Sequence, residues 1–250
     1  MYSLGIDSGS TTTKGILFDG KNIVRSFITK TSSNPKESIK RVYDELNCKE
    51  VGYVVTTGYG RKLLAEANKN VTEITCHAQG AAYLNKDTRT IIDIGGQDSK
   101  VILLDRDLNV VDFLMNDKCA SGTVRFIEVM MRILEEDMEN IDEFVKDRTP
   151  VNITSMCTVF AESEIISLLC QDVHKGDIAL GIIDSITTRT VNFARRLNIQ
   201  GEVFFSGGLA KYDVFRSIIE EKLGFKTNTH ELSQFAGAIG AAIIAYRTIK

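Results

Sequence analysis

Two segments of the chain match one another residue by residue, and this internal repeat limits the available folds more than any other feature. Residues 4–19 superpose on residues 90–105 without a gap, so that Asp7 falls on Asp93. Each copy reads as an apolar strand, a turn containing glycine and a second apolar strand, and a third strand-like run follows. The chain is therefore expected to contain a duplicated three-stranded β-meander.

The turns of the two copies carry the residue types that hold a nucleotide phosphate together with magnesium. Glycines let backbone N–H groups approach an anion closely, and an aspartate beside them holds a hydrated cation. Asp7 and Asp93 each lie at the start of such a turn. Two hairpins that face each other across a cleft would bind a phosphate chain from both sides. We therefore expect an α/β fold with a nucleotide cleft between its duplicated halves.

Composition and charge narrow the class of protein. Of the 250 residues, 43% are hydrophobic and 25% are charged, which is enough to bury a substantial core in one or two domains. The formal net charge of −3 and the lack of a basic aromatic stretch argue against a nucleic acid partner. The N-terminus lacks the pattern of a signal peptide, and no stretch reaches ~18 consecutive apolar residues. We expect no membrane segment and a cytoplasmic location.

Five cysteines, an odd number, indicate free thiols or metal ligands rather than a disulfide framework. Cys119 and Cys157 each lie at or just before a predicted helix start, where the helix dipole favours a thiolate, and Ser121 and Thr158 are available as caps. Neither cysteine has CxxC spacing, so two ligands per chain complete a four-thiolate site only if a second subunit supplies the others. The alternative is that both are small apolar fillers.

Four further motifs have weaker interpretations. Residues 57–61 predict a glycine-rich turn with a structural arginine or, alternatively, a contact surface, followed by a helix through Ala67. His77 has no second ligand at a defined spacing, so we expect a packed or capping histidine. Residues 206–209 follow a short strand and form either a tight turn or a backbone approach to a base or ribose. Residues 235–242 predict a small-residue helix that packs closely against another.

The order of these motifs resembles that of the actin, sugar-kinase and heat-shock-ATPase superfamily over nearly the whole chain. In the terms of that superfamily, the segments similar to the first phosphate, second phosphate, adenosine and second connecting motifs are residues 7–14, 93–100, 206–209 and 237–241. The resemblance implies two duplicated ribonuclease H-like, actin-like ATPase domains with the nucleotide cleft between them.

The same resemblance implies where the two domains divide. The first is expected to span residues 1–86 and to be completed by a C-terminal helix at 235–250. The second is expected to span residues 87–234 and to carry both candidate metal ligands, Cys119 and Cys157.

Within the superfamily, the chain resembles the activators of 2-hydroxyacyl-CoA dehydratases, a group close to the ATPase subunits of benzoyl-CoA reductase. The motifs that carry this resemblance are Gly-Ile-Asp-Ser-Gly-Ser-Thr-Thr-Thr-Lys, Thr-Gly-Tyr-Gly-Arg, Asp-Ile-Gly-Gly-Gln-Asp-Ser-Lys, Asn-Asp-Lys-Cys-Ala-Ser-Gly-Thr and Met-Cys-Thr-Val-Phe-Ala-Glu-Ser-Glu. It implies a homodimer that shares one [4Fe-4S] cluster, with Cys119 and Cys157 of each chain as ligands. ATP would drive an electron, from a donor such as ferredoxin or flavodoxin, onto a 2-hydroxyacyl-CoA dehydratase or a related iron-sulfur reductase.

Roles for the phosphate-motif residues follow from the motifs and the resemblance together. Asp7 and Asp93 are expected to orient Mg²⁺ through water, and Gln97 or Asp98 to position the attacking water. Lys14 either neutralises phosphate charge or faces solvent. The residues expected to bind ATP or ADP are Ser8, Gly9, Ser10, Thr11, Thr12, Thr13, Lys14, Gly95, Gly96, Gly207, Gly208, Leu209 and Gly237.

Two other classes of protein use similar motifs. A small-molecule kinase of the same fold would use the same phosphate motifs, with an aspartate base beside a substrate hydroxyl and no need for paired cysteines. A nucleotide-dependent assembly or chaperone-like protein would polymerise or bind clients whether or not Cys119 and Cys157 were replaced. The cysteine contexts argue against both alternatives.

Overall fold

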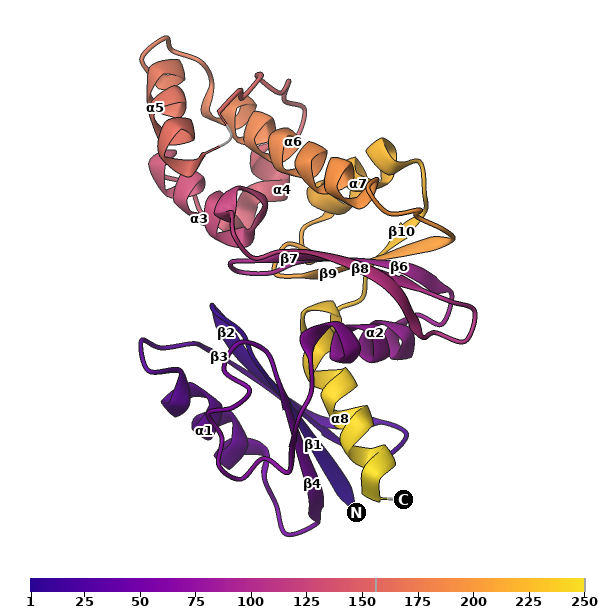
Figure 1. Cartoon of the computed structure of the whole chain (residues 1–250). Coiled ribbons are helices and arrows are strands. Elements are labelled where there is room, and N and C mark those ends of the chain that lie inside the picture. Colours follow the sequence, from indigo (N-terminus) through magenta and orange to yellow (C-terminus); the bar gives the residue numbers. More distant parts are fainter. Residues whose placement is uncertain (156, 250) are drawn as a thin grey trace.

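The computed structural model describes residues 1–155 and 157–249, which form two five-stranded sheets with helices packed against them (Figure 1). The expected α/β class is confirmed. Met156, in the second cysteine motif, and Lys250, at the end of the predicted C-terminal helix, lie outside the described residues.

The two sheets repeat one arrangement of strands. In each, three consecutive strands form an antiparallel meander, whose first strand also pairs in parallel with a later strand. Asp7 lies opposite Lys14 in the first meander, and Asp93 lies opposite Lys100 in the second, so the predicted duplication is confirmed. The first sheet, in the order β3-β2-β1-β4-β5, contains β1 (Tyr2–Ser8), β2 (Thr12–Phe18), β3 (Ile23–Lys30), β4 (Val51–Thr57) and β5 (Lys69–Asn70). The second, in the order β10-β9-β6-β7-β8, contains β6 (Thr88–Ile94), β7 (Ser99–Leu104), β8 (Val110–Asn116), β9 (Glu202–Gly207) and β10 (Thr227–Asn228).

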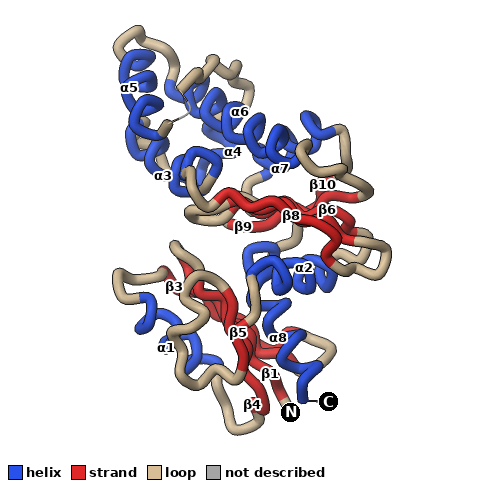
Figure 2. Tube along the Cα trace, viewed as in Figure 1, coloured by secondary structure: helices blue, strands red, loops and turns tan. Residues whose placement is uncertain are grey.

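Helices cover both faces of the first sheet. The helix α1 (Pro35–Leu46) packs against the meander on one face, and α8 (Ala236–Ile249) packs against β1, β2 and β4 on the other. A strand that is covered on both faces is buried along its length, and every residue of β1 after Tyr2 is buried. The helix α2 (Glu73–Leu84) packs on α8 and on the second sheet, so these two helices lie between the sheets (Figure 2).

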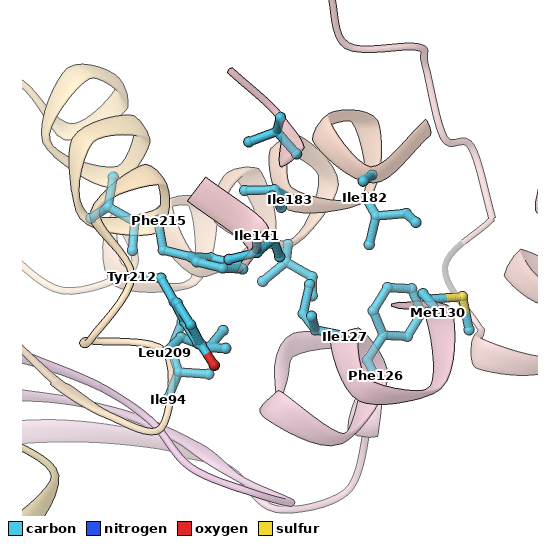
Figure 3. Close-up of a cluster of buried hydrophobic side chains, with 14 of the residues drawn as sticks. Ile94, Phe126, Ile127, Met130, Ile141, Ile182, Ile183, Leu209, Tyr212 and Phe215 are labelled. Carbon is cyan, nitrogen blue, oxygen red and sulfur yellow. The ribbon is translucent and has the colours of Figure 1, made fainter. Parts of the chain in front are cut away.

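The outer face of the second sheet carries the largest core of the molecule, shown in Figure 3. Phe126, Ile127 and Met130 of α3 contribute to it, with Ile182 and Ile183 of α6. The helical elements on this side are η1 (Ala120–Gly122), α3 (Val124–Ile133), η2 (Met138–Asn140), α4 (Ile141–Phe144), α5 (Thr158–Leu169), α6 (Lys175–Ala194) and α7 (Asp213–Leu223), and η3 (Ser233–Phe235) precedes α8. None of the helices in the described part of the chain has the length and apolar character needed to span a bilayer.

The helix predicted to end at Ala67 is wrong, because residues 58–67 form successive turns. The carbonyl oxygen of Arg61, which a helix would use as an acceptor, instead accepts hydrogen bonds from Thr56 Oγ1 at 2.7 Å and Asn70 Nδ2 at 2.9 Å. These partners lie on neighbouring strands. The sequence around Arg61 therefore gave no sign that its carbonyl would bind them instead of a helical N–H group.

Close packing of α8 against α2, predicted from its small residues, is confirmed. A Cβ atom at Gly240 would overlap the carbonyl group of Cys76 on α2, and one at Gly80 would overlap the carbonyl group of Ala236. The two helices therefore touch through their backbones, an approach that only glycine permits. This contact fixes α8, which packs on the first sheet, to α2, which also packs on the second sheet.

Replacing Gly240 by alanine is expected to lower the free energy of unfolding by about 2 kcal/mol. Overlap with a fixed backbone outweighs the gain of about 1 kcal/mol in helix propensity. Urea unfolding measures the change. The control is Thr248→Ala, at an exposed position of the same helix, with an expected change within about 0.5 kcal/mol. Equal unfolding midpoints for both variants would contradict the backbone contact.

Candidate active site

The two meander turns face one cavity of about 280 Å³ between the sheets. Because strand pairing places both turns at the same end of their sheets, residues from distant parts of the sequence line it together. The predicted site residues among its lining are Asp7, Gly9, Ser10, Thr11, Thr12, Lys14, Asp93, Gly95, Gly96, Asp98, Gly207 and Gly208. The cavity thus collects acidic side chains, glycines and small hydroxyl residues from the two phosphate motifs and the Gly-Gly turn after β9.

Five predicted residues lie outside this lining. Ser8 and Thr13 are buried beneath it because side chains alternate along a strand, and their neighbours Asp7 and Lys14 take the cavity side. The hydroxyl of Thr13 instead bonds to that of Thr31 at 2.9 Å, Leu209 is buried in the core of Figure 3, and Gln97 is exposed on an adjoining groove. The fifth residue, Gly237, lies directly behind Asp7.

The carboxylate of Asp7 is closely surrounded by backbone. A Cβ atom at Gly237 would lie 2.7 Å from Asp7 Oδ2, and one at Gly58 would lie 2.6 Å from Asp7 Oδ1. The side chain of Asp7 is 5% exposed and makes no hydrogen bond or ion pair with any other residue that the structure describes. A buried carboxylate without a partner is costly, so this position fits a hydrated cation.

Asp93, its counterpart, has its partners within the protein. Ser206 Oγ donates to Asp93 Oδ1 at 2.7 Å, Lys100 Nζ lies 3.4 Å from Oδ2, and His77 Nε2 lies 3.6 Å from Oδ1. Burial alone would raise the pKa of Asp93, but His77, Lys100 and the Ser206 hydroxyl together hold that pKa well below its ordinary value. Lys14 contributes to the same lowering from the opposite sheet. Lys14 therefore lines the cleft instead of facing solvent.

Lys100 is a buried cation among three carboxylates. Its side chain pairs with Glu73 Oε2 at 3.1 Å, with Asp93, and most closely with Asp98. Burial would lower the pKa of Lys100, but the carboxylates of Asp93, Asp98 and Glu73 raise it above its ordinary value, so the ammonium is a fixed charge. It holds the second phosphate turn in place.

The cavity residues that sequence reasoning missed include Lys100, Glu73 and His77, which surround Asp93. His77 is packed as predicted, with Nδ1 2.9 Å from the Glu73 carbonyl oxygen, but its ring also lines the cavity. Two signals were available. Lys100 occupies the place of Lys14 in the repeat, and Glu73 and His77 lie one helical turn apart on one face of α2.

The two cysteines predicted as metal ligands are exposed and lie at helix starts. Cys119 is itself the N-cap of η1, and Cys157 is the N-cap of α5, so the prediction that Ser121 and Thr158 are the caps is wrong. The hydroxyl and N–H of Ser121 lower the pKa of Cys119, whose Sγ lies 2.9 Å from Ser121 Oγ. No group of three or more metal-binding side chains occurs among the described residues.

Backbone hydrogen bonds join the second phosphate turn to the segment that bears Cys119. The N–H of Val124 donates to the carbonyl of Gly95 at 3.0 Å, and the N–H of Arg125 donates to that of Gly96 at 3.1 Å. These donors belong to the first turn of α3, which follows η1 directly. A displacement of the phosphate turn therefore reaches Cys119 through a few peptide units.

Duplicated α/β halves with an acidic, glycine-lined cavity between them define an actin-like ATPase. The chain belongs to the BadF/BadG/BcrA/BcrD ATPase family, which matches residues 4–245. Uncharacterized protein YjiL of Escherichia coli is 48% identical over 98% of this chain and 97% of its own length. The (R)-2-hydroxyglutaryl-CoA dehydratase activating ATPase of Acidaminococcus fermentans is 42% identical over 99% and 98% of the two chains. The solved activator of the 2-hydroxyisocaproyl-CoA dehydratase from Clostridium difficile, with bound ADPNP, has a TM-score of 0.92 and 37% identity, covering 99% of this chain and 95% of that one.

Replacing Lys100 by methionine is expected to lower the free energy of unfolding at pH 7 by about 3 kcal/mol, because three carboxylates lose their cation. Without Lys100, the carboxyl of Asp93 takes up a proton at higher pH in the folded protein than in the unfolded chain. The deficit therefore shrinks as the pH falls from 7 to 5. Urea unfolding at both pH values measures it.

Lys118→Met is the control for this change, because Lys118 pairs with Asp117 on the surface with 88% of its side chain exposed. It is expected to have little effect at either pH. A deficit for the Lys100 variant that grows toward pH 5 would contradict the assigned role of the buried ammonium.

Proposed function

We propose that this protein is an ATP-hydrolysing iron-sulfur reductase that passes a low-potential electron to a partner metalloenzyme. The observation that carries the proposal is the direct hydrogen bonding of the Gly95–Gly96 turn to the start of α3, beside Cys119. It couples a nucleotide cavity to a thiol. The names of the relatives support a 2-hydroxyacyl-CoA dehydratase as the partner, with a related iron-sulfur reductase as the other candidate.

The nucleotide part of the proposal follows from the cavity. ATP binds between the two turns, and Asp7 and Asp93 orient its Mg²⁺ through water. Asp7 has no cation of its own and is exposed only toward the cavity, which fits this role. Asp98 positions the attacking water and is better placed than Gln97, because it lines the cavity beside Lys100. The backbone around Gly207 approaches the nucleoside end of ATP.

The proposed metal site follows from the two cysteine thiols. Cys119 and Cys157 supply two exposed thiols, which suit a [4Fe-4S] cluster, and a second copy of the chain supplies the other two. When bound, such a cluster accepts and releases one electron at low potential. Val159 and Phe160, each 67% exposed, lie beside Cys157 and support a homodimer, because adjoining exposed apolar side chains mark interfaces.

Nucleotide turnover acts on the cysteines through the protein. Binding draws the two turns together, and loss of the terminal phosphate releases the Gly95–Gly96 turn, whose carbonyls hold the first turn of α3. A shift of α3 then alters the surroundings of Cys119, and such surroundings set a reduction potential.

The expected domain division supports a hinge for this motion, with residues 1–86 and 235–250 in one domain and residues 87–234 in the other. The proposed electron donor is ferredoxin or flavodoxin, and the proposed location is the cytoplasm.

Replacing Asp7 by asparagine is expected to lower the rate of ATP hydrolysis about 100-fold, because a neutral amide holds the hydrated magnesium poorly. A coupled assay of phosphate release measures the rate. The control is Asp107→Asn, in the exposed turn before β8, which changes the net charge by the same amount as Asp7→Asn. It is expected to hydrolyse ATP at the normal rate. Equal rates in the two variants would remove Asp7 from the magnesium site.

Iron and acid-labile sulfide should each reach about four per dimer in protein purified without oxygen. Both should be lost in Cys119→Ser and in Cys157→Ser, while Cys170→Ser, at another exposed cysteine, should keep them. A wild-type dimer that hydrolyses ATP but cannot be loaded with iron and sulfide would contradict the electron-transfer proposal. ADP release that depends on an added small-molecule substrate would then indicate a kinase.

A further inference from the structure

One side chain hydrogen-bonds to both cysteine-bearing segments. Arg189, on α6, donates from Nη1 to the carbonyl of Ser121 at 3.2 Å and from Nη2 to the carbonyl of Ser155 at 2.8 Å. Ser121 and Ser155 are each two residues from a cysteine, Cys119 and Cys157 respectively. The guanidinium therefore bridges two segments that are far apart in the sequence.

Each segment also has an anchor of its own. The side chain of Asn116 accepts from the N–H of Cys119 at 3.2 Å and donates to its carbonyl at 3.0 Å. The carboxylate of Glu164 accepts from the N–H groups of Thr154 at 2.9 Å and Ser155 at 2.8 Å. These anchors act within each segment and do not connect one segment to the other. Among the described side chains, only that of Arg189 hydrogen-bonds to both.

Arg189 is itself held in place. It is half-buried, it extends from the long helix α6, and its guanidinium lies over the ring of Phe126 with 5.8 Å to the ring centroid. A guanidinium presents its N–H donors in a rigid planar fork, so the positions of two acceptors bound to it are fixed relative to each other.

We propose that Arg189 is a positioning residue that sets the spacing of Cys119 and Cys157 within one chain before any metal group binds, and that places a permanent positive charge between the two segments. The inference rests on the proposed function for the use of that spacing, which is ligation of a shared cluster. The spacing itself is a property of the metal-free protein and can be measured there.

The first test uses a bifunctional thiol reagent that becomes fluorescent when both of its arms have reacted. It is applied to metal-free protein carrying Cys48→Ser and Cys170→Ser, with Cys76 left in place because it is buried. Products that keep the mass of a single chain report the spacing within that chain. Wild-type Arg189 should allow rapid cross-linking. Arg189→Met should slow it at least about tenfold, the factor that corresponds to the net loss of one hydrogen bond to a charged group.

Two further variants separate the parts of the proposal. Arg189→Lys keeps the charge but offers a flexible point donor in place of the fork, so its cross-linking should also be slow. Arg195→Met is the matched control: Arg195 follows α6 and also donates to a backbone carbonyl, that of Lys222 at 2.6 Å. It should cross-link at the rate of the parent. Circular dichroism and ATP hydrolysis check that each variant is folded.

The second test measures the reduction potential of iron-loaded protein. Loss of the positive charge in Arg189→Met should shift the potential to a more negative value, while Arg189→Lys should stay near the wild type, a difference that altered packing alone would not produce. Cross-linking at the parent rate in folded Arg189→Met, or in Arg189→Lys if the methionine variant does not fold, would overturn the inference. If the cross-linking results hold but wild-type protein takes up no iron, the electron-transfer proposal fails and the positioning role of Arg189 stands.

Discussion

The structure depends on the positive charges that balance two buried aspartates at one cavity. The repeat places Asp7 and Asp93 at equivalent strand ends, and in each copy a lysine lies opposite. In the second copy Lys100 is buried and paired with Asp93, whereas in the first copy Lys14 makes no ion pair with any residue in the described chain. The two hairpins are thus similar in sequence but differ in charge pairing. In the second hairpin, the buried aspartate is balanced by a lysine of the same hairpin. In the proposed function the other hairpin is completed by the magnesium ion of the nucleotide.

The helices beside the two aspartates also pack between the two sheets. Gly237 lets Asp7 approach α8, and Gly240, one turn further along that helix, lets α8 touch the backbone of α2. The helix α2 in turn carries Glu73 and His77 to the second aspartate. The acidic cavity and the packing between the two sheets therefore involve the same two helices.

The sequence predicted the parts of the fold that local periodicity governs. Strand alternation and glycine placement in the repeat were enough to find both meanders and the two turns that line the cavity. Contacts made between distant elements were not predictable in this way. Thr56 and Asn70 capture the carbonyl of Arg61 and prevent a helix. Glu73 meets Lys100 only after α2 has packed on the second sheet. For the cysteines, the sequence predicted the helix starts but not the side chain that holds the two segments together.

The unpartnered carboxylate of Asp7 has a consequence for the protein in the cell. A ligand that binds only the folded state raises the free energy of unfolding in proportion to the logarithm of its free concentration. In the proposed function magnesium nucleotide brings the charge that Asp7 lacks, so the empty protein would be the least stable form of the molecule. Proteases act on transiently opened chains, and the population of such chains follows that free energy. The lifetime of the protein would then depend on the nucleotide supply.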